Sequence, residues 1–191
     1  MSTHTSWTVT RRTDACILRT PTAEFTTRAY ALRDPSHVGH TALVLRYGRI
    51  TNGMVLRINS ACITSEAFAD ESCDCASQLA STLALCVREG SGMIIYAPFD
   101  EGRGVGLFNK INSIALMQRT GLSSHQAFAA LGLSEDARDF GYVGPILNAE
   151  AVASVRIVGR NQAKIAAVRR AGVDISGYLD ADGTPQSIML A

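Results

Sequence analysis

The run Met93-Ile94-Ile95-Tyr96-Ala97, closed by Pro98 and followed by the glycine-rich segment 100–106, decides the fold class. A short run of this kind predicts a buried strand, and the proline ends it because proline lacks a backbone N–H. Apolar residues at helical spacing predict a helix before this strand, over 77–89, and helices after it, over 106–118 and 124–131. Ser123 or Ser124 is expected to cap the last of these helices. A strand set between helices is typical of an α/β layer structure.

The alternation continues toward the C-terminal end of the chain. The further elements expected are a helix over 147–152, a strand over 154–158, a helix over 163–171 and a last strand over 173–175. Gly172 is expected to end the helix before it, because glycine readily adopts the left-handed conformation that closes helices. The sequence therefore predicts an α/β fold with a mixed β-sheet and flanking helices.

The first third of the chain is expected to be rich in β-structure. Residues 42–48 predict a strand that ends in a glycine turn, and residues 54–58 predict its antiparallel neighbour. Residues 1–16 are polar and rich in threonine, which predicts either a frayed end or an added strand. We expect residues 1–17 to form an N-terminal extension and residues 18–191 to form a single domain, because no long linker or repeat divides them.

The composition excludes several classes of protein. The chain has 191 residues, of which 47% are hydrophobic and 18% are charged, so that it can bury a core. The formal net charge of +1 argues against a nucleic-acid polymer as partner, because such a partner requires many clustered cations. No run approaches the roughly 20 apolar residues of a membrane helix, and the first thirty residues hold no export signal. We therefore expect a soluble, cytoplasmic protein that has no membrane partner.

The cysteines Cys62, Cys73 and Cys75 lie within fourteen positions of one another. Three thiolates can hold zinc and leave its fourth tetrahedral position for water, as catalytic zinc sites do. Three buried or idle cysteines without a metal are the alternative interpretation. The polar residues around Cys73 and Cys75 are not those of an apolar core, so the pattern favours a metal site.

Further cysteines and histidines lie elsewhere in the sequence. No fourth cysteine or histidine lies nearby in sequence, and His37 and His40 are the candidates for a ligand that would close the site. Cys16 and Cys86 are assigned to packing, since Cys86 falls on the apolar stripe of its predicted helix.

Two polar segments are candidate anion sites. The glycines of 100–106 allow backbone N–H groups to approach a ligand, and Arg103 adds a donor suited to phosphate. The segment 159–164 joins a strand to a helix and contributes Arg160 and Lys164 at a position where α/β proteins often bind ligands. An ordinary turn or connection is the alternative in both cases. The segment 136–139, taken alone, predicts a solvated turn.

Several motifs in order resemble the GTP cyclohydrolase II family. They are Ser60-x-Cys62-x-Thr64-Ser65-Glu66-x-Phe68, Cys73-Asp74-Cys75-x-x-Gln78-Leu79 and Glu101-Gly102-Arg103-Gly104-x-Gly106-Leu107-x-Asn109-Lys110-Ile111. The likeness continues through Leu131-Gly132-x-x-x-Asp136-x-Arg138-x-Phe140 and Val155-Arg156-Ile157 with Lys164, and it covers roughly residues 18 to 175. The resemblance implies the family's α/β domain and the opening reaction of riboflavin biosynthesis.

The resemblance also implies a chemistry and its residues. Zinc held by Cys62, Cys73 and Cys75 would activate water for attack at C8 of guanine, formate would leave, and Mg²⁺ would assist the loss of pyrophosphate. Asp136 matches the family's proton acceptor, and Arg138 its nucleophile or stabiliser at the α-phosphate. We favour an electrostatic clamp for Arg138, because a guanidinium stays protonated. The positions that match nucleotide-contacting residues are Arg57, Ser60, Gln78, Glu101, Gly102, Arg103, Ser124 and Lys164. The family is commonly dimeric, which implies a homodimer.

Some positions depart from the family's pattern. The family's active-site tyrosine is absent from 112–116, where Ile114 stands, and Gln126 replaces a glutamate. Changed polar contacts favour a changed ligand or product. We therefore expect a zinc-dependent hydrolase that opens the imidazole ring of a purine nucleotide, with GTP as the default substrate and with release of pyrophosphate. In one form of this hypothesis the reaction ends at a product that keeps the formyl group. The alternatives are the same chemistry on another nucleotide or on a pyrimidine ring, and a non-catalytic nucleotide-binding zinc protein.

Overall fold

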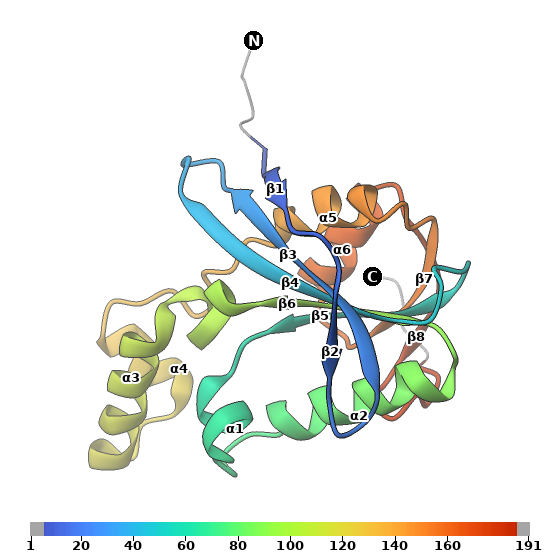
Figure 1. Cartoon of the computed structure of the whole chain (residues 1–191). Helices are drawn as coiled ribbons and strands as arrows, with labels where there is room; N and C mark the ends of the chain where they lie inside the picture. Colours follow the sequence, from blue (N-terminus) through green and yellow to red (C-terminus); the bar gives the residue numbers. More distant parts are fainter. Residues whose placement is uncertain (1–5, 187–191) are drawn as a thin grey trace.

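The computed structural model describes residues 6–186 and contains one eight-stranded sheet with flanking helices (Figure 1). The strand order is β1-β3-β4-β6-β5-β7-β8, and β2 pairs with β3. The strands are β1 (Thr8–Arg12), β2 (Cys16–Arg19), β3 (Glu24–Arg33), β4 (Gly39–Tyr47), β5 (Met54–Ser60), β6 (Gly92–Ala97), β7 (Ser154–Val158) and β8 (Asp174–Leu179). The helices are α1 (Ile63–Phe68), α2 (Cys75–Arg88), α3 (Gly106–Thr120), α4 (Ser124–Ala130), α5 (Val143–Ala149) and α6 (Gln162–Arg170), with short 3₁₀ segments η1 (Pro98–Gly104) and η2 (Phe140–Tyr142). The predicted fold class is confirmed.

The sheet changes from antiparallel to parallel at β6. This strand pairs antiparallel with β4, where Leu43 lies opposite Tyr96, and parallel with β5, where Ile58 lies opposite Ile95. The direct pairing predicted between 42–48 and 54–58 is therefore wrong, because β6 lies between those strands. Most residues of β5 are buried whichever face they point to, which suits the middle of a parallel sheet better than a hairpin.

Helices cover both faces of the sheet (Figure 1). One face carries α5 and α6 over a core that includes Leu56 and Ile95, and the other carries α2 over a core that includes Val55 and Ile94. Neighbouring strand residues belong to different cores because successive side chains of a strand point to opposite faces. Cys86 is fully buried in the α2 core, which confirms its assignment to packing.

The polar N-terminal segment adds strands to the antiparallel side of the sheet. Both β1 and β2 pair with β3, so the added strand is the alternative that the structure bears out. Trp7, which precedes β1, is 8% exposed and donates from Nε1 to Asp139 Oδ2 at 2.7 Å. Residues 1–5 lie outside the described part of the chain. Cys16 is exposed on β2, so its assignment to packing is wrong.

Two C-terminal elements differ from their predicted positions. The helix expected over 147–152 is α5, which begins earlier and holds Pro145 in its first turn, where a missing N–H costs no helical hydrogen bond. The strand expected over 173–175 extends to Leu179, because it pairs with β7 along its length. The other predicted helices and strands are present, with boundaries moved by a few residues. Among the described residues no helix is long and apolar enough to cross a membrane.

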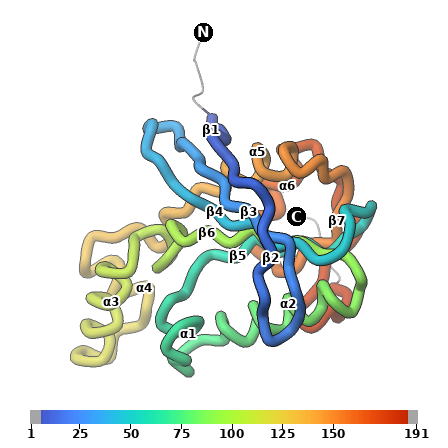
Figure 2. Tube along the Cα trace, in the orientation of Figure 1, coloured from blue at the N-terminus to red at the C-terminus, as the bar shows by residue number. Residues whose placement is uncertain are grey.

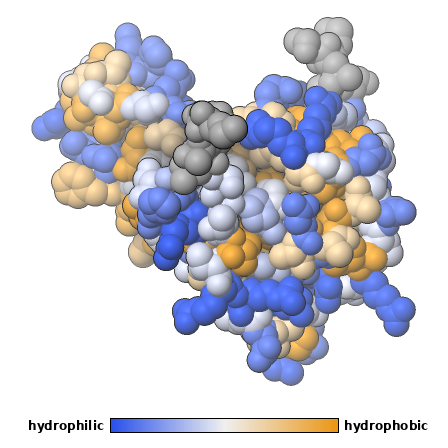
Figure 3. Space-filling view, turned by 90° about the horizontal axis from the view of Figure 1, so that it is seen from above, coloured by the Kyte–Doolittle hydropathy of each residue, from blue (hydrophilic) through white to orange (hydrophobic). Residues whose placement is uncertain are grey.

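Helices α3 and α4 form a lobe beside the sheet (Figure 2). They pack against each other, and α3 follows directly from η1. The large apolar side chains of Leu107, Phe108 and Ile111 are exposed on α3. Figure 3 shows hydrophobic residues on the surface of this lobe.

Candidate active site

Cys62, Cys73 and Cys75 converge beyond the carboxyl end of β5. Cys62 directly precedes α1, Cys75 begins α2, and Cys73 lies in the loop between these helices. Their sulfur atoms lie within 4.8 Å of one another, and Cys62 Sγ is 3.6 Å from Cys73 Sγ. Zinc–sulfur bonds of about 2.3 Å in a tetrahedral site place two sulfurs about 3.8 Å apart. The donor set therefore fits a zinc ion.

Neither histidine considered as a fourth ligand joins this cluster, which among the described residues contains cysteines alone. His40 Nε2 lies 3.0 Å from Asp34 Oδ2, and its ring packs against Trp7 and Phe99. His37 lies in the connection between β3 and β4. A set of three protein ligands leaves a coordination position for water, which is the arrangement of catalytic rather than structural zinc sites.

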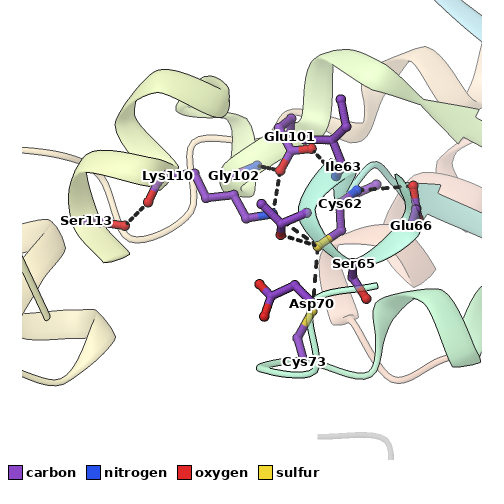
Figure 4. A network of polar contacts seen from close by, with 12 residues as sticks. Cys62, Ile63, Ser65, Glu66, Asp70, Cys73, Glu101, Gly102, Lys110 and Ser113 are labelled. Atoms are coloured by element: carbon purple, nitrogen blue, oxygen red, sulfur yellow. Dashed lines mark hydrogen bonds and ion pairs between the residues drawn. The ribbon is translucent and has the colours of Figure 1, made fainter. Parts of the chain in front are cut away.

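Charged side chains surround Cys62 (Figure 4). Lys110 reaches from α3 to within 3.1 Å of Cys62 Sγ, and Glu66 Oε2 accepts the backbone N–H of Cys62 at 3.3 Å. Burial raises the pKa of the Cys62 thiol, but hydrogen bonds, first among them that from Lys110, bring it below its usual value. Burial, together with the neighbouring thiols, raises the pKa of Cys75 to about 12. A bound cation is therefore needed before all the sulfurs become thiolates.

Glu101 links the segment around the cysteines to α3 through hydrogen bonds. Its Oε1 accepts hydrogen bonds from Lys110 Nζ at 2.8 Å and from the Gly102 N–H at 3.0 Å, and its Oε2 accepts the Ile63 N–H at 2.6 Å. Gly102 has φ of 61°, and a Cβ there would lie 3.0 Å from Lys110 Cβ. Glycine at this position lets α3 approach the cluster closely. Glu101, which with Gly102 was predicted to contact substrate, thus holds Lys110 beside Cys62, and the Gly102 N–H holds Glu101.

A cavity of about 240 Å³ with a cationic wall lies beside the thiol cluster. The lining residues that the sequence assigned to substrate or catalysis are Arg57, Gln78, Arg138 and Lys164. The cavity and the cluster draw on the same helix, because α2 carries Cys75 in its first turn and Gln78 three positions later. Arg57 lies on β5, the strand that leads to Cys62, and its Nη2 donates to Gln78 Oε1 at 3.0 Å.

Lys164 is the amine of this cavity. Its Nζ donates to the Ile58 carbonyl at 2.9 Å and lies 5.3 Å from the centre of the Phe140 ring. Burial, with repulsion from Arg138 as the next cause, lowers the pKa of Lys164 to about 8. An anion in the cavity would favour the protonated amine, because an opposite charge stabilises the charged form.

Asp136 and Arg138 form a tight pair at the cavity. Asp136 Oδ1 accepts from Arg138 Nε at 2.8 Å, and Oδ2 accepts from Nη2 at 2.5 Å. The hydrogen bond from Arg138 lowers the pKa of Asp136, which makes this carboxylate a weak base and a firm holder of the guanidinium. Arg138 Nη1 also donates to Ser60 Oγ at 3.1 Å. The segment 136–139, which alone predicts a solvated turn, is therefore part of the site.

The glycine-rich segment packs against the loop that carries Arg138. Gly104 has φ of 84°, and a Cβ there would lie 2.9 Å from the carbonyl carbon of Ala137. The Ala137 N–H donates to the Arg103 carbonyl at 2.9 Å. The side chain of Arg103 points instead to Glu135, 3.9 Å away, and does not line the cavity. The glycines thus bring two loops together, a role distinct from cradling an anion.

Ser124 and the two departing positions lie on the lobe of α3 and α4. Ser123 Oγ accepts the Gln126 N–H at 3.3 Å, and Gln126 Oε1 accepts the Ser123 N–H at 2.9 Å, which is a capping box. Ser123 is therefore the helix cap, and Gln126 has a structural role that its S-x-x-Q spacing could have revealed. Ser124 begins α4 away from the cavity lining, and Ile114 is half-buried on α3.

A buried acid lies behind Arg138, and the sequence reasoning missed it. Asp100 is 2% exposed, and its Oδ2 accepts hydrogen bonds from Ser60 Oγ at 2.9 Å and from the Tyr142 hydroxyl at 2.8 Å. Burial raises the pKa of Asp100. Its place just beyond the carboxyl end of β6, where α/β sheets bind ligands, is the signal that could have found it. Tyr142 carried no signal of this kind.

A thiol cluster and a cationic cavity near the carboxyl ends of the central strands are typical of an α/β enzyme, and they give this one a candidate metal centre and a candidate anion site. The sequence profile of the GTP cyclohydrolase II family matches residues 11–180. The chain belongs to this family and is an enzyme of its cyclic amidine hydrolase type.

Curated relatives agree with this assignment. The chain is 36% identical over 171 residues to GTP cyclohydrolase-2 of Streptomyces coelicolor, which covers 87% of this chain and 76% of the relative. It is 42% identical over 138 residues to GTP cyclohydrolase-2 of Buchnera aphidicola subsp. Acyrthosiphon pisum, which covers 71% and 69%. It is 36% identical over 165 residues to riboflavin biosynthesis protein RibBA of Salinispora arenicola, which covers 85% of this chain and 39% of that protein. The resemblance found in the motifs is thus confirmed at the level of the family.

Proposed function

We propose that this protein opens the imidazole ring of GTP by hydrolysis at a zinc centre and releases pyrophosphate, at the start of riboflavin synthesis. The observation that carries the proposal is that β5 and α2 position residues of both the thiol cluster and the cationic cavity. One nucleotide that spans the two would meet the cysteines with its base and the cations with its phosphates. The relatives named GTP cyclohydrolase-2 support GTP as the substrate.

Cys62, Cys73 and Cys75 would hold the zinc ion. When bound, zinc supplies a Lewis acid that lowers the pKa of a water molecule from its bulk value to roughly 7. The chain prepares this centre with Lys110, whose ammonium lies 3.1 Å from Cys62 Sγ and offsets the negative charge of the thiolates. Glu66 fixes the backbone of Cys62 on the opposite side.

The cationic cavity would bind the phosphates. Arg57 and Lys164 supply positive charge to the oxygens, and Arg138 stabilises the charge that develops at the α-phosphate when pyrophosphate leaves. Asp136 orients the guanidinium through its two hydrogen bonds. Mg²⁺ would accompany the triphosphate, because this ion is commonly bound through substrate phosphates and few protein ligands.

A reaction that stops early is the second candidate, and Ile114 is the observation that favours it. Ring opening adds one water and leaves a formyl group on the former ring nitrogen, whereas deformylation needs a second water and further proton transfer. A phenol near the ring could relay that proton, but the side chain of Ile114 has no polar atom. The protein would then release a formyl-retaining nucleotide.

The zinc-loaded protein incubated with GTP and Mg²⁺ tests both candidates. Mass spectrometry of the products, with assays for formate and pyrophosphate, should find a ring-opened nucleotide and free pyrophosphate. A product that keeps the formyl group supports the early stop, and rapid release of formate contradicts it. Unchanged GTP under all these conditions would contradict the proposed function as a whole.

We also propose that the protein is a homodimer. The exposed side chains of Leu107, Phe108 and Ile111 support it, because contiguous exposed apolar residues are typical of contact surfaces. Light scattering of the purified protein measures its mass in solution. The mass of a single chain across the micromolar range would contradict this part of the proposal.

A further inference from the structure

The pair formed by Asp100 and Tyr142 lies behind Arg138, and neither residue lines the cationic cavity. Tyr142 is fully buried and Asp100 is 2% exposed. A buried carboxylate requires hydrogen-bond donors, and Asp100 Oδ2 receives two, from Tyr142 at 2.8 Å and from Ser60 at 2.9 Å. Both donors are neutral hydroxyls, so they leave the negative charge of Asp100 uncancelled.

The hydrogen bond to Asp100 determines whether the Ser60 hydroxyl donates or accepts toward the cavity. A serine hydroxyl has one proton to donate and two lone pairs that accept. Because the proton goes to Asp100 Oδ2, only lone pairs remain for the cavity, and Arg138 Nη1 donates to one of them at 3.1 Å. The hydrogen bonds therefore run in one direction, from Arg138 through Ser60 to Asp100, with Tyr142 as the second donor at the end.

This chain of hydrogen bonds ties the clamp to the rigid part of the fold. Asp136 also binds Arg138, but it lies two positions away on the same loop and its side chain is 41% exposed, so it can move with the arginine. Ser60 ends β5, inside the sheet, 78 positions away in sequence. The hydrogen bond to Ser60 is thus the contact that fixes the position of the Arg138 guanidinium relative to the sheet.

We infer that Asp100 and Tyr142 are positioning residues for Arg138: they hold the Ser60 hydroxyl as an acceptor and thereby set the orientation in which the guanidinium meets the α-phosphate. The inference rests on the proposed function for the identity of the reaction. Its geometric part, the restraint on Arg138, does not depend on any substrate.

Tyr142→Phe removes one donor from Asp100 and keeps the shape of the ring. With zinc-loaded protein and GTP, we expect kcat to fall about tenfold or more while the affinity for GTP stays within about twofold. The reason is that a less well oriented Arg138 guanidinium stabilises the transition state less, whereas it contributes little to binding of the ground state. In an Arg138→Ala background, Tyr142→Phe should cause no further loss, since residues that act through one another are not additive.

The chain offers a matched control in Tyr30→Phe. Tyr30 is also fully buried, belongs to the same core, and donates to a buried carboxylate, that of Glu150. This variant should lose stability without losing kcat. If Tyr30→Phe and Tyr142→Phe reduce kcat equally, or if Tyr142→Phe changes only KM, the inference is overturned.

A measurement on Arg138 itself separates this inference from the proposed function. In protein labelled with ¹⁵N-arginine, the guanidinium signals of Arg138, assigned by their loss in Arg138→Lys, should show hindered rotation in the wild type and in Tyr30→Phe. In Tyr142→Phe and Asp100→Asn the rotation should become faster. Unchanged rotation in both variants overturns the inference, even where turnover is normal. Absence of turnover in the wild type contradicts the proposed function, and the rotation rate then still decides the role of the pair.

Discussion

Two buried carboxylates of this protein accept a hydrogen bond from a buried tyrosine, and their surroundings differ. Glu150, 6% exposed, accepts from Tyr30 and lies 3.5 Å from Arg28 Nη1 and 3.9 Å from Arg46 Nη1. These ion pairs join α5's end to the antiparallel strands β3 and β4. The charge of this acid is met directly by cations, which is how a structural ion pair in a protein interior is satisfied.

Asp100 has no such partner among the ion pairs of the described residues. Asp100 accepts hydrogen bonds from the neutral hydroxyls of Ser60 and Tyr142. Arg138 and Lys164 lie near enough to reduce the rise in its pKa that burial causes, but they form no ion pair with it. Arg138 pairs with Asp136 and Lys164 donates to the Ile58 carbonyl, so neither cation is paired with the buried acid. The comparison teaches that the same motif, a buried acid with a tyrosine, stabilises the fold where cations cancel it and prepares a site where they do not.

The largest loss of activity is expected from a change in the thiol cluster, and no similar cluster lies near Glu150 among the described residues. Cys73→Ser should abolish turnover and reduce the zinc content from about one ion per chain to nearly none, because three protein ligands are the minimum of a catalytic site. Elemental analysis and the GTP assay measure both. Cys16→Ser, at an exposed position on β2, is the control and should change neither. Full zinc content in Cys73→Ser would contradict the assignment of the metal ligands.

The arginines give the next largest contrast. Arg138→Ala should lower kcat about a hundredfold to a thousandfold with little change in affinity, because a preorganised charge acts mainly in the transition state. Arg28→Ala should lower stability to urea and leave kcat unchanged, because Arg28 pairs with Glu150 and neither residue lines the cavity. The comparison between the two acids breaks down if Arg138→Ala raises only KM, or if Arg28→Ala lowers kcat as much as Arg138→Ala does.

The smallest expected effect is a pH dependence of binding. Burial lowers the pKa of Lys164 to about 8 from the usual 10.5, so its charge is lost as the pH rises through this value, and the KM for GTP should rise by at most about tenfold per pH unit above it. Between about pH 8 and 10.5 the unfolded chain binds this proton more tightly, so the Lys164 contribution to stability increases with pH in that window. Lys164→Arg stays charged and should have a flat KM profile. Parallel profiles in the two proteins would show that another group titrates.

The sequence was sufficient to predict the fold class and the cysteine cluster. Apolar periodicity located most helices and strands. The spacing of Cys62, Cys73 and Cys75 among polar residues predicted a metal centre, and the structure brings these three side chains together. The order of strands was out of reach, because the insertion of β6 between β4 and β5 depends on contacts between segments far apart in sequence. Local patterns specify elements but not their neighbours in a sheet.

The candidate site was predicted only in part. Resemblance supplied Arg57, Gln78 and Lys164, and these line one cavity with Arg138. Arg103 and Ser124 lie outside the lining of that cavity. Asp100 and Tyr142 were missed because burial turns an ordinary acid and an ordinary tyrosine into a functional pair, and burial is a property of the folded chain.

Ring opening at C8 can be followed directly with GTP labelled with ¹³C at that carbon. The zinc-loaded protein is incubated with this GTP and Mg²⁺, and the label is followed by ¹³C NMR. We predict that the C8 signal of the purine disappears and that a formamide signal, or a formate signal if the reaction proceeds further, takes its place. A C8 signal that keeps its purine shift while pyrophosphate is released would show that the protein cleaves the triphosphate alone, and would contradict the account.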